Sequence, residues 1–188
     1  SDRVLMVGQI CRYTPGFAQA KALIDAGEIG ELYFVESEYA HDYAKIPGVG
    51  GWRTDPLRHG MIGGGCHAVD FLRWIAGDPE EVYAYSTHKV LTDWPTDDTT
   101  IAIMKFPNDI IGKVFCSTGC KRNYTMRTLI YGTKGTIICD NTSPTITYFG
   151  VNEDQTHKKA EEIPVGNVNN HNVKDEIKVF VDAIVNNK

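Results

Sequence analysis

The chain has 188 residues, which suggests one domain, and its 42% hydrophobic and 23% charged residues exclude a mainly disordered protein. Its formal net charge of −5 makes it a poor candidate for binding duplex nucleic acid or an anionic membrane. No apolar run approaches the roughly 20 residues that a membrane span needs, so we expect neither a nucleic-acid nor a membrane partner.

The segment 1–43 predicts a strand, a helix and a second strand. The apolar run at 4–7 is typical of a short buried strand. Thr14 can cap a helix that has Pro15 in its first turn, and apolar residues at helical spacing extend this helix over about 15–26. Aromatic, apolar and polar residues then alternate over 31–43, as they do in a strand. Because the chain lacks an initial Met and opens on a strand-like run, we expect a piece of a longer protein.

A stretch rich in glycine and proline follows at 44–60 and excludes a long regular element there. Such a stretch in a compact domain is usually functional or disordered. Its notable polar and aromatic residues are Trp52, Arg53, Asp55, Arg58 and His59. Three glycines at 63–65 then lead into a second helix, which the sequence Gly-Asp-Pro at 77–79 ends.

From 80 to 149 the pattern becomes mainly strands. The candidate ranges are 81–90, 98–106, 110–118, 125–131, 135–140 and 145–149. Short turns at 107–109 and 132–135 predict that the strands beside them form antiparallel hairpins. The polar segment 151–170 predicts an exposed loop with an edge strand near 158–164. Apolar residues at helical spacing from Val173 onward predict an amphipathic helix that continues to the end of the chain.

This order of elements predicts an α+β domain, built on a largely antiparallel open sheet with helices packed on one face. The strand at 98–106 is apolar on both faces, with Ala102 and Met104 on one and Ile101 and Ile103 on the other. We therefore expect helices to cover one face of this strand and a second subunit to cover the other.

Cysteine usage favours a reducing compartment, so we expect a cytoplasmic protein. The five cysteines are Cys11, Cys66, Cys116, Cys120 and Cys139. Their odd number and scattered spacing argue against a disulfide framework and against a zinc site. The sequence also lacks the glycine-rich dinucleotide fingerprint, a Walker sequence, the G-x-S-x-G elbow and the H-E-x-x-H zinc motif.

The strongest candidate for chemistry is the segment from Gly63 to Asp70. The glycines allow a ligand or another group to approach the backbone closely. His67 falls in the first turn predicted for the helix, where the positive helix end favours a neutral imidazole that can accept a proton. Asp70 lies three residues further on the same face, where it can orient His67 or bind a ligand. The plainer interpretation is a capping or packing histidine.

The segment Gly63–Gly77, with the sequence GGGCHAVDFLRWIAG, resembles the active-site helix of the Gfo/Idh/MocA oxidoreductases, the glucose-fructose oxidoreductase and inositol dehydrogenase group. Residues 12–30 resemble the opening of that family's second domain, and 176–184 resemble its late helix. The resemblance implies that 1–188 form a single C-terminal substrate-binding and oligomerisation domain. It also implies that 1–12 correspond to the last strand of a Rossmann domain that is absent here and that binds NAD or NADP. The fragment alone is then expected to be inactive.

Carried over residue by residue, the resemblance makes His67 the catalytic base, which takes the hydroxyl proton of a sugar or polyol while hydride leaves the same carbon. Asp70 matches a position that touches the substrate. The other implied substrate-binding residues are Trp52, Arg53 and Asp55. Many members have an Asp where this chain has Gly63, so one polar partner is missing. The resemblance further implies a homodimer or homotetramer formed through the sheet face, and no metal.

Two other functions stay open at this point. A non-catalytic carbohydrate-binding or scaffold module of the same fold is favoured by Gly63, because the family's acidic residue is missing there. A metal-dependent hydrolase would instead use His59, His67 and Asp70 as ligands.

Overall fold

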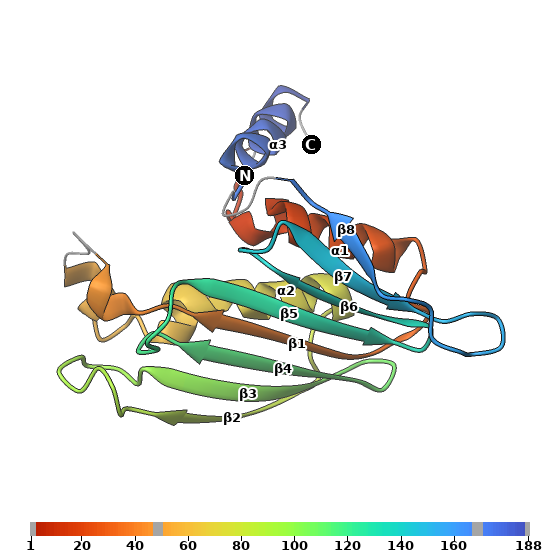
Figure 1. The fold of residues 1–188 in the computed structure, drawn as a ribbon. Helices are drawn as coiled ribbons and strands as arrows, with labels where there is room; N and C mark the ends of the chain where they lie inside the picture. The colour runs from red at the N-terminus through yellow and green to blue at the C-terminus, as the bar shows by residue number, and fades with distance from the viewer. Residues whose placement is uncertain (1–2, 47–50, 167–170, 187–188) are drawn as a thin grey trace.

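A computed structural model describes residues 3–46, 51–166 and 171–186 and shows one open sheet of eight strands (Figure 1). The strands are β1 Leu32–Ala40, β2 Glu81–Thr87, β3 Thr99–Phe106, β4 Ile110–Ser117, β5 Thr125–Gly132, β6 Gly135–Asp140, β7 Thr145–Gly150 and β8 Glu161–Pro164. Their order across the sheet is β2-β3-β4-β1-β5-β6-β7-β8. The β1–β4 pair is parallel and the other six pairs are antiparallel, including both expected hairpins.

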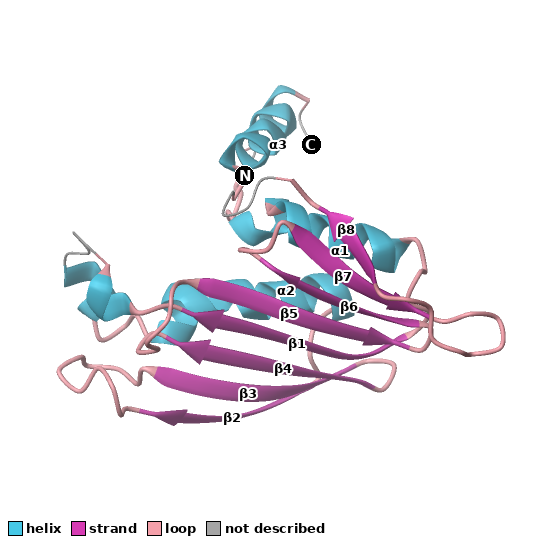
Figure 2. Cartoon of the chain, viewed as in Figure 1, coloured by secondary structure: helices cyan, strands magenta, loops and turns pink. Residues whose placement is uncertain are grey.

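Two helices cover one face of this sheet, as expected (Figure 2). Helix α1, Pro15–Asp25, packs against β6 and β7, and α2, Cys66–Ala76, packs against β1 and β4. The predicted α+β fold with a largely antiparallel sheet is confirmed. The third helix, α3 Val173–Val185, lies away from the sheet and contacts η1, the 3-10 helix Ile10–Tyr13.

The core lies between the sheet and the two covering helices. Phe17 of α1 and Phe71 of α2 are fully buried, and their ring centroids are 4.9 Å apart. On the sheet side, β3 contributes Ala102, Met104 and Phe106, as its alternating pattern predicts. The opposite face of β3 is exposed at Ile101 and Ile103, so helices cover only one of its two apolar faces.

The strand predicted at 4–7 is wrong for the described chain. None of the described ladders includes these residues, and the side chains of Leu5 and Val7 are exposed. A strand needs a neighbour for its backbone N–H and C=O groups, and no strand of this sheet supplies one to 4–7.

The loops follow the expected pattern with short helical additions. The stretch 44–60 holds two 3-10 turns, η2 Tyr43–Lys45 and η3 Gly51–Thr54, and its residues 47–50 lie outside the described part. The loop after β7 leads to the predicted edge strand, β8. Residues 167–170 of the predicted loop 151–170, and the last two residues of the predicted final helix, also lie outside the described residues.

Candidate active site

The glycine-rich segment is itself helical and enters α2 without a break. Residues Met61–Gly65 form one π-helical turn, labelled η4, and the His59 carbonyl accepts the first N–H bonds, from Ile62 at 2.8 Å and Gly63 at 2.9 Å. The unpaired N–H groups of the helix start therefore lie about one turn before His67. His67 is the second residue of α2 and lies in its first turn, as expected, although the π-helical turn precedes that turn without a break.

Close approach explains why glycine occupies the middle of this turn. A Cβ atom added at Gly64 would lie 2.6 Å from the hydroxyl oxygen of Tyr43 and would overlap the ring of Tyr39. The glycine thus lets the end of β1 press directly against the start of α2, and this brings Tyr39 next to His67.

His67 is half-buried, and its environment favours the neutral imidazole. Burial is the main cause that lowers its pKa below the ordinary 6.5, and a charge on His171 lowers it further, while Asp70 raises it. The neutral state agrees with the expectation from the sequence, and burial is its main cause. The Nδ1 atom lies 3.2 Å from the side-chain oxygen of Gln9.

Asp70 is fully engaged with Arg12 rather than with His67. The guanidinium donates from Nε to Oδ2 at 2.8 Å and from Nη2 to Oδ1 at 2.7 Å. These hydrogen bonds raise the pKa of Arg12. Both carboxylate oxygens of a nearly buried side chain are therefore occupied by a bidentate pair, which ties η1 to α2.

Four rings pack together in what we call the aromatic wall, and one of them, Tyr39, lies next to His67: Tyr39, His41, Tyr43 and Tyr124. The hydroxyl of Tyr39 lies 3.2 Å from Nδ1 of His41 and 3.3 Å from the hydroxyl of Tyr43. The Tyr39 ring is 6.3 Å from the His67 ring, and the His41 ring is 4.8 Å from that of Tyr124. Burial raises the pKa of the tyrosines of the wall and lowers that of His41.

Sequence reasoning missed this wall. The available signal was the spacing of two residues along 39, 41 and 43, which puts alternate side chains of an extended segment on one side. Tyr124 gave no local signal, because it reaches the wall from the connection between β4 and β5.

Two of the predicted substrate residues extend the wall. The guanidinium of Arg53 lies 4.4 Å from the centre of the Tyr43 ring and 4.3 Å from that of Trp52. Arg58 stacks on the same Trp52 at 4.4 Å. Asp55 is not brought to the wall: it is exposed, and its Oδ1 accepts the backbone N–H of Leu57 at 2.8 Å. His67, Arg53 and Trp52 are thus joined through the aromatic wall.

A cavity of about 360 Å³ opens beside His41 and Tyr124. Asp42 lies in it and is only 5% exposed, yet neither carboxylate oxygen is hydrogen-bonded to a described group. The nearest cations are the ammonium groups of Lys45 and Lys121, each 3.8 Å away. The carboxylate is thus buried between two ammonium groups, which partly offset the cost of burying its charge.

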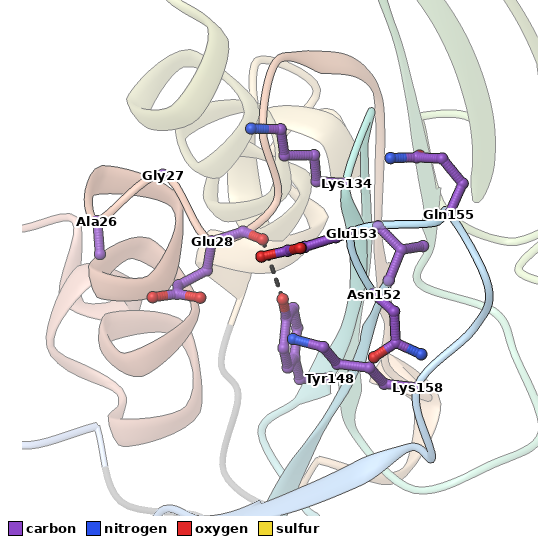
Figure 3. A pocket seen from close by; sticks show the side chains of 10 residues that line it. Ala26, Gly27, Glu28, Lys134, Tyr148, Asn152, Glu153, Gln155 and Lys158 are labelled. Carbon is purple, nitrogen blue, oxygen red and sulfur yellow. Dashed lines mark hydrogen bonds between the residues drawn. The ribbon is translucent and has the colours of Figure 1, made fainter.

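A second cavity, of about 450 Å³, lies at the opposite end of β1 (Figure 3). Tyr148 donates there to the carbonyl of Glu28 at 2.9 Å, and Lys134, Lys158 and Glu153 surround it. Its charges are mixed, and it contains no residue of the wall or of α2, so we do not place the site there.

The described part of the chain offers neither a metal site nor a membrane-spanning helix. It contains no cluster of three His, Cys, Asp or Glu side chains arranged to hold a metal, and His59 instead accepts the backbone N–H of Met61 at 3.2 Å. None of its helices has the length and apolar character that crossing a membrane requires.

Comparison with known families gives one match, and it covers most of the core of the sheet. The model of the GFO/IDH/MocA C-terminal domain matches residues 17–138. Myo-inositol 2-dehydrogenase of Thermotoga maritima is 26% identical over 157 residues, which cover 77% of this chain and 43% of that protein. The scyllo-inositol 2-dehydrogenase (NAD(+)) of Bacillus subtilis is 26% identical over 152 residues, which cover 73% of this chain and 42% of that protein. The chain therefore spans about two fifths of these relatives.

Solved structures show the same fold. Levoglucosan dehydrogenase in complex with NADH and L-sorbose superimposes with a TM-score of 0.83 at 22% identity. The match covers 100% of this chain and 58% of that one. At this identity the likeness establishes the fold alone.

Proposed function

Because the chain belongs to the GFO/IDH/MocA C-terminal domain family, we propose that it is the substrate-binding domain of an NAD(P)-dependent dehydrogenase that acts on a sugar or polyol hydroxyl. The observation that carries this proposal is the state of His67: a half-buried, neutral imidazole beside the aromatic wall. Oxidation of an alcohol requires a base for the hydroxyl proton, and a neutral imidazole is such a base near neutral pH.

His67 performs the proton transfer in this proposal. With Nδ1 directed at Gln9, the second ring nitrogen, Nε2, is left to accept the substrate hydroxyl proton. Burial destabilises the resulting imidazolium, so His67 readily releases the proton to solvent after the oxidation. In the reverse reaction the imidazolium gives its proton to the oxygen of the carbonyl compound that is being reduced.

The groups around His67 suit a polyhydroxylated substrate. The half-buried rings of the wall, His41 and Tyr124, offer apolar surface to the C–H groups of a sugar, and Trp52 extends the wall. The cavity beside His41 and Tyr124 is also lined by Lys45 and Lys121, whose ammonium groups can donate hydrogen bonds to hydroxyl groups. We assign Arg53 and Trp52 to the substrate side as well, and Asp70 to a supporting role through Arg12.

The described residues do not fit a dinucleotide. None of their strands leads through a glycine-rich turn into a helix, and the glycines at 63–65 are helical, with Gly64 packed against two tyrosines and Gly65 against Met61 and Cys116. NAD or NADP is therefore proposed to be held by a domain outside this chain, which residues 1–12 would join. The isolated chain is accordingly expected to be inactive.

The test uses the whole protein that contains this chain. Reduction of NAD and NADP is followed by absorbance with a panel of inositols and sugars, in the wild type and in His67→Ala. Loss of about 100-fold or more in kcat supports the base, since general bases contribute 10²–10⁴-fold. His157→Ala, on the exposed far loop, is the matched control and should keep full activity. Equal turnover of His67→Ala and wild type would remove His67 from the mechanism.

The second candidate, a non-catalytic carbohydrate-binding module, is favoured by Gly63. Its backbone has only the Tyr43 hydroxyl, at 4.0 Å, near the place of a Cβ atom, and no carboxylate stands there. Polyol binding by the whole protein without turnover on either cofactor would select this candidate.

We also propose that the exposed sheet face joins two or more subunits and that the protein works in the cytoplasm. The exposed apolar side chains on neighbouring positions of β2, β3 and β4 are Tyr83, Tyr85, Ile101, Ile103 and Ile111. Such a contiguous apolar patch is typical of an interface. All five cysteines are free, which suits a reducing compartment.

A further inference from the structure

We infer that Gln9 is a positioning residue that holds His67 in the tautomer with the proton on Nδ1, so that Nε2 is the atom that accepts a proton. This inference rests on the proposed role of His67 as a base. It adds a residue that neither the motif nor the family resemblance indicates, because Gln9 lies in the segment before η1.

The contact is part of a two-point clamp between η1 and α2. Gln9 and Arg12 are three residues apart at the start of η1, and their partners His67 and Asp70 are three residues apart on α2. The Arg12–Asp70 pair has two short hydrogen bonds, of 2.8 and 2.7 Å. One turn earlier on both elements, the Gln9 oxygen meets Nδ1 of His67 at 3.2 Å.

The clamp holds Gln9 in place through its backbone as well. Its N–H donates to the Val7 carbonyl at 3.0 Å, and its own carbonyl accepts the N–H of Arg12 at 3.1 Å. The side chain therefore starts from a backbone that the Arg12–Asp70 pair anchors. This places the Gln9 side chain within reach of His67.

The chemistry of an amide oxygen sets the tautomer. In the amide orientation of the structure the Gln9 oxygen faces Nδ1, and because a carbonyl oxygen only accepts hydrogen bonds, Nδ1 carries the proton. A neutral imidazole has one N–H, and with Nδ1 protonated the lone pair is on Nε2. Without the Gln9 oxygen, the free-energy preference between the tautomers is small and part of the protein would present an Nε2–H, which cannot accept the substrate proton.

An amide also differs from a carboxylate in its effect on the base. A carboxylate at this place would stabilise imidazolium and raise the pKa of His67, whereas a neutral amide orients the ring without that charge. The charged groups that face His67 are Asp70 and His171, and they act in opposite directions. The Asp70 charge is largely satisfied by Arg12, so burial decides and the imidazole stays neutral.

The test reads the tautomer directly. The whole protein is labelled with ¹⁵N-histidine, and the ring-nitrogen shifts are recorded above the pKa of His67, with His67→Gln used to assign its signals. We expect the Nδ1–H tautomer in the wild type and a mixture in Gln9→Leu, which keeps the volume but removes the acceptor. Gln19→Leu, on α1, is the matched control and should leave the shifts unchanged. Gln9→Glu keeps the acceptor and should keep the tautomer.

Kinetics supply a second measurement. Gln9→Leu should lower kcat by about 10-fold or more, in the range of groups that orient a catalytic ligand or base, with little change in KM. An Nε2–H tautomer in the wild type, or an unchanged tautomer in Gln9→Leu, would overturn the inference. Absence of turnover on every substrate would instead count against the proposed function and would leave the tautomer result standing, so the two failures are distinguishable.

Discussion

Burial, more than charge, sets the behaviour of individual side chains around His67. It is the first cause of the lowered pKa of His67 and His41 and of the raised pKa of Cys11 and Cys116, both to about 12. The two thiols are therefore inert near neutral pH. The two histidines stay neutral where exposed histidines begin to charge.

The lowered pKa of His67 makes stability fall with acid. The unfolded chain protonates this ring at about the ordinary 6.5, while the folded protein does so only at a lower pH. Unfolding thus takes up a proton between these values, and the free energy of unfolding falls as pH drops below about 6.5, by at most about 1.4 kcal/mol per pH unit. His67→Gln should flatten this dependence in urea unfolding between about pH 7.5 and 5.5. The pKa of His41 is lowered as well, so part of the dependence of unfolding free energy on pH should remain in His67→Gln. A dependence as steep as that of the wild type would contradict the lowered pKa of His67.

The close approach at Gly64 predicts a sharp difference between two neighbouring glycines. Gly64→Ala should lower the free energy of unfolding by about 1–3 kcal/mol, because the methyl group overlaps Tyr39 and Tyr43. Gly63→Ala is the control: its methyl group would meet only the Tyr43 hydroxyl at 4.0 Å, and alanine favours a helix by up to about 1 kcal/mol. Equal losses in thermal unfolding of the two variants would refute the packing argument.

The functional role of a single residue can be predicted from the sequence when the pattern that indicates it lies in neighbouring residues. His67 and the Trp52–Arg53 pair stand in conspicuous contexts, next to a glycine run and within a proline-rich stretch. Tyr124 and Gln9 do not, since their roles arise from contacts with residues 58 or more positions away, as Gln9 shows with His67. Propensity and periodicity contain no information on such pairs.

A polar pair holds the short N-terminal element η1 against α2. The short helix η1 has four residues and could not hold its position by propensity alone. The Arg12–Asp70 pair fixes it on α2, and α3 in turn contacts η1. Loss of this pair should therefore loosen the N-terminal segment and α3 together.

A double-mutant cycle on this pair measures the effect. Arg12→Leu should destabilise by about 2 kcal/mol, because it leaves a nearly buried carboxylate without its donors. Asp70→Asn in the same background should recover part of this loss, giving a coupling of about 1–2 kcal/mol. The exposed Lys21–Asp25 pair on α1 is the comparison and should show about 0.5 kcal/mol or less. A coupling no larger than that of the comparison pair would show that the clamp is unimportant for stability.

Most elements could be predicted, because periodicity and turn residues are strong for helices and hairpins. The helix at 15–26 and the strands from 98 to 149 agree with the structure within one or two residues. The strand at 4–7 failed because an apolar run specifies burial and not a partner. The π-helical turn at Met61–Gly65 was not predicted, because glycines have low helix propensity and the packing of Gly64 against Tyr39 and Tyr43 is a long-range contact.

The whole molecule is asymmetric, with helices on one face of the sheet and apolar side chains exposed on part of the other. Ile103 is 55% exposed and lies opposite Tyr83, which is 62% exposed. Beyond this patch the same face is charged: Glu36 pairs with Lys113 at 2.5 Å, and Glu38 pairs with Arg122 at 2.7 Å. The patch is thus bounded, as an interface with an apolar centre and a polar rim would be.

Association through this face is tested by Ile103→Glu. Placing a charge at the centre of the patch should reduce the mass measured by light scattering or sedimentation, since a buried unpaired charge costs several kcal/mol. Leu57→Glu is the control, because this residue is 83% exposed but lies in a loop away from β2 and β3. If the mass of Ile103→Glu equals that of the wild type, the sheet face is not the interface.

The strand order could not be predicted from the sequence, although the strands themselves could. Turns indicate which consecutive strands pair, and they correctly give β3 with β4 and β5 with β6. They say nothing of β1, which comes first in the chain and lies between β4 and β5. That position depends on pairings with residues some 75 to 100 positions later, such as Phe34 with Ile111 and with Tyr131.

The central place of β1 has a consequence for how the protein is made. The ribosome releases β1 first, but both of its neighbours follow only after the loop, α2 and the first hairpin have been synthesised. Two meanders, β2-β3-β4 and β5-β6-β7-β8, can form from local contacts, whereas β1 must close large loops to join them. We expect the insertion of β1 to be the slow step of folding, and a nascent chain stalled before β5 to expose one unpaired edge of the strand that bears Tyr39.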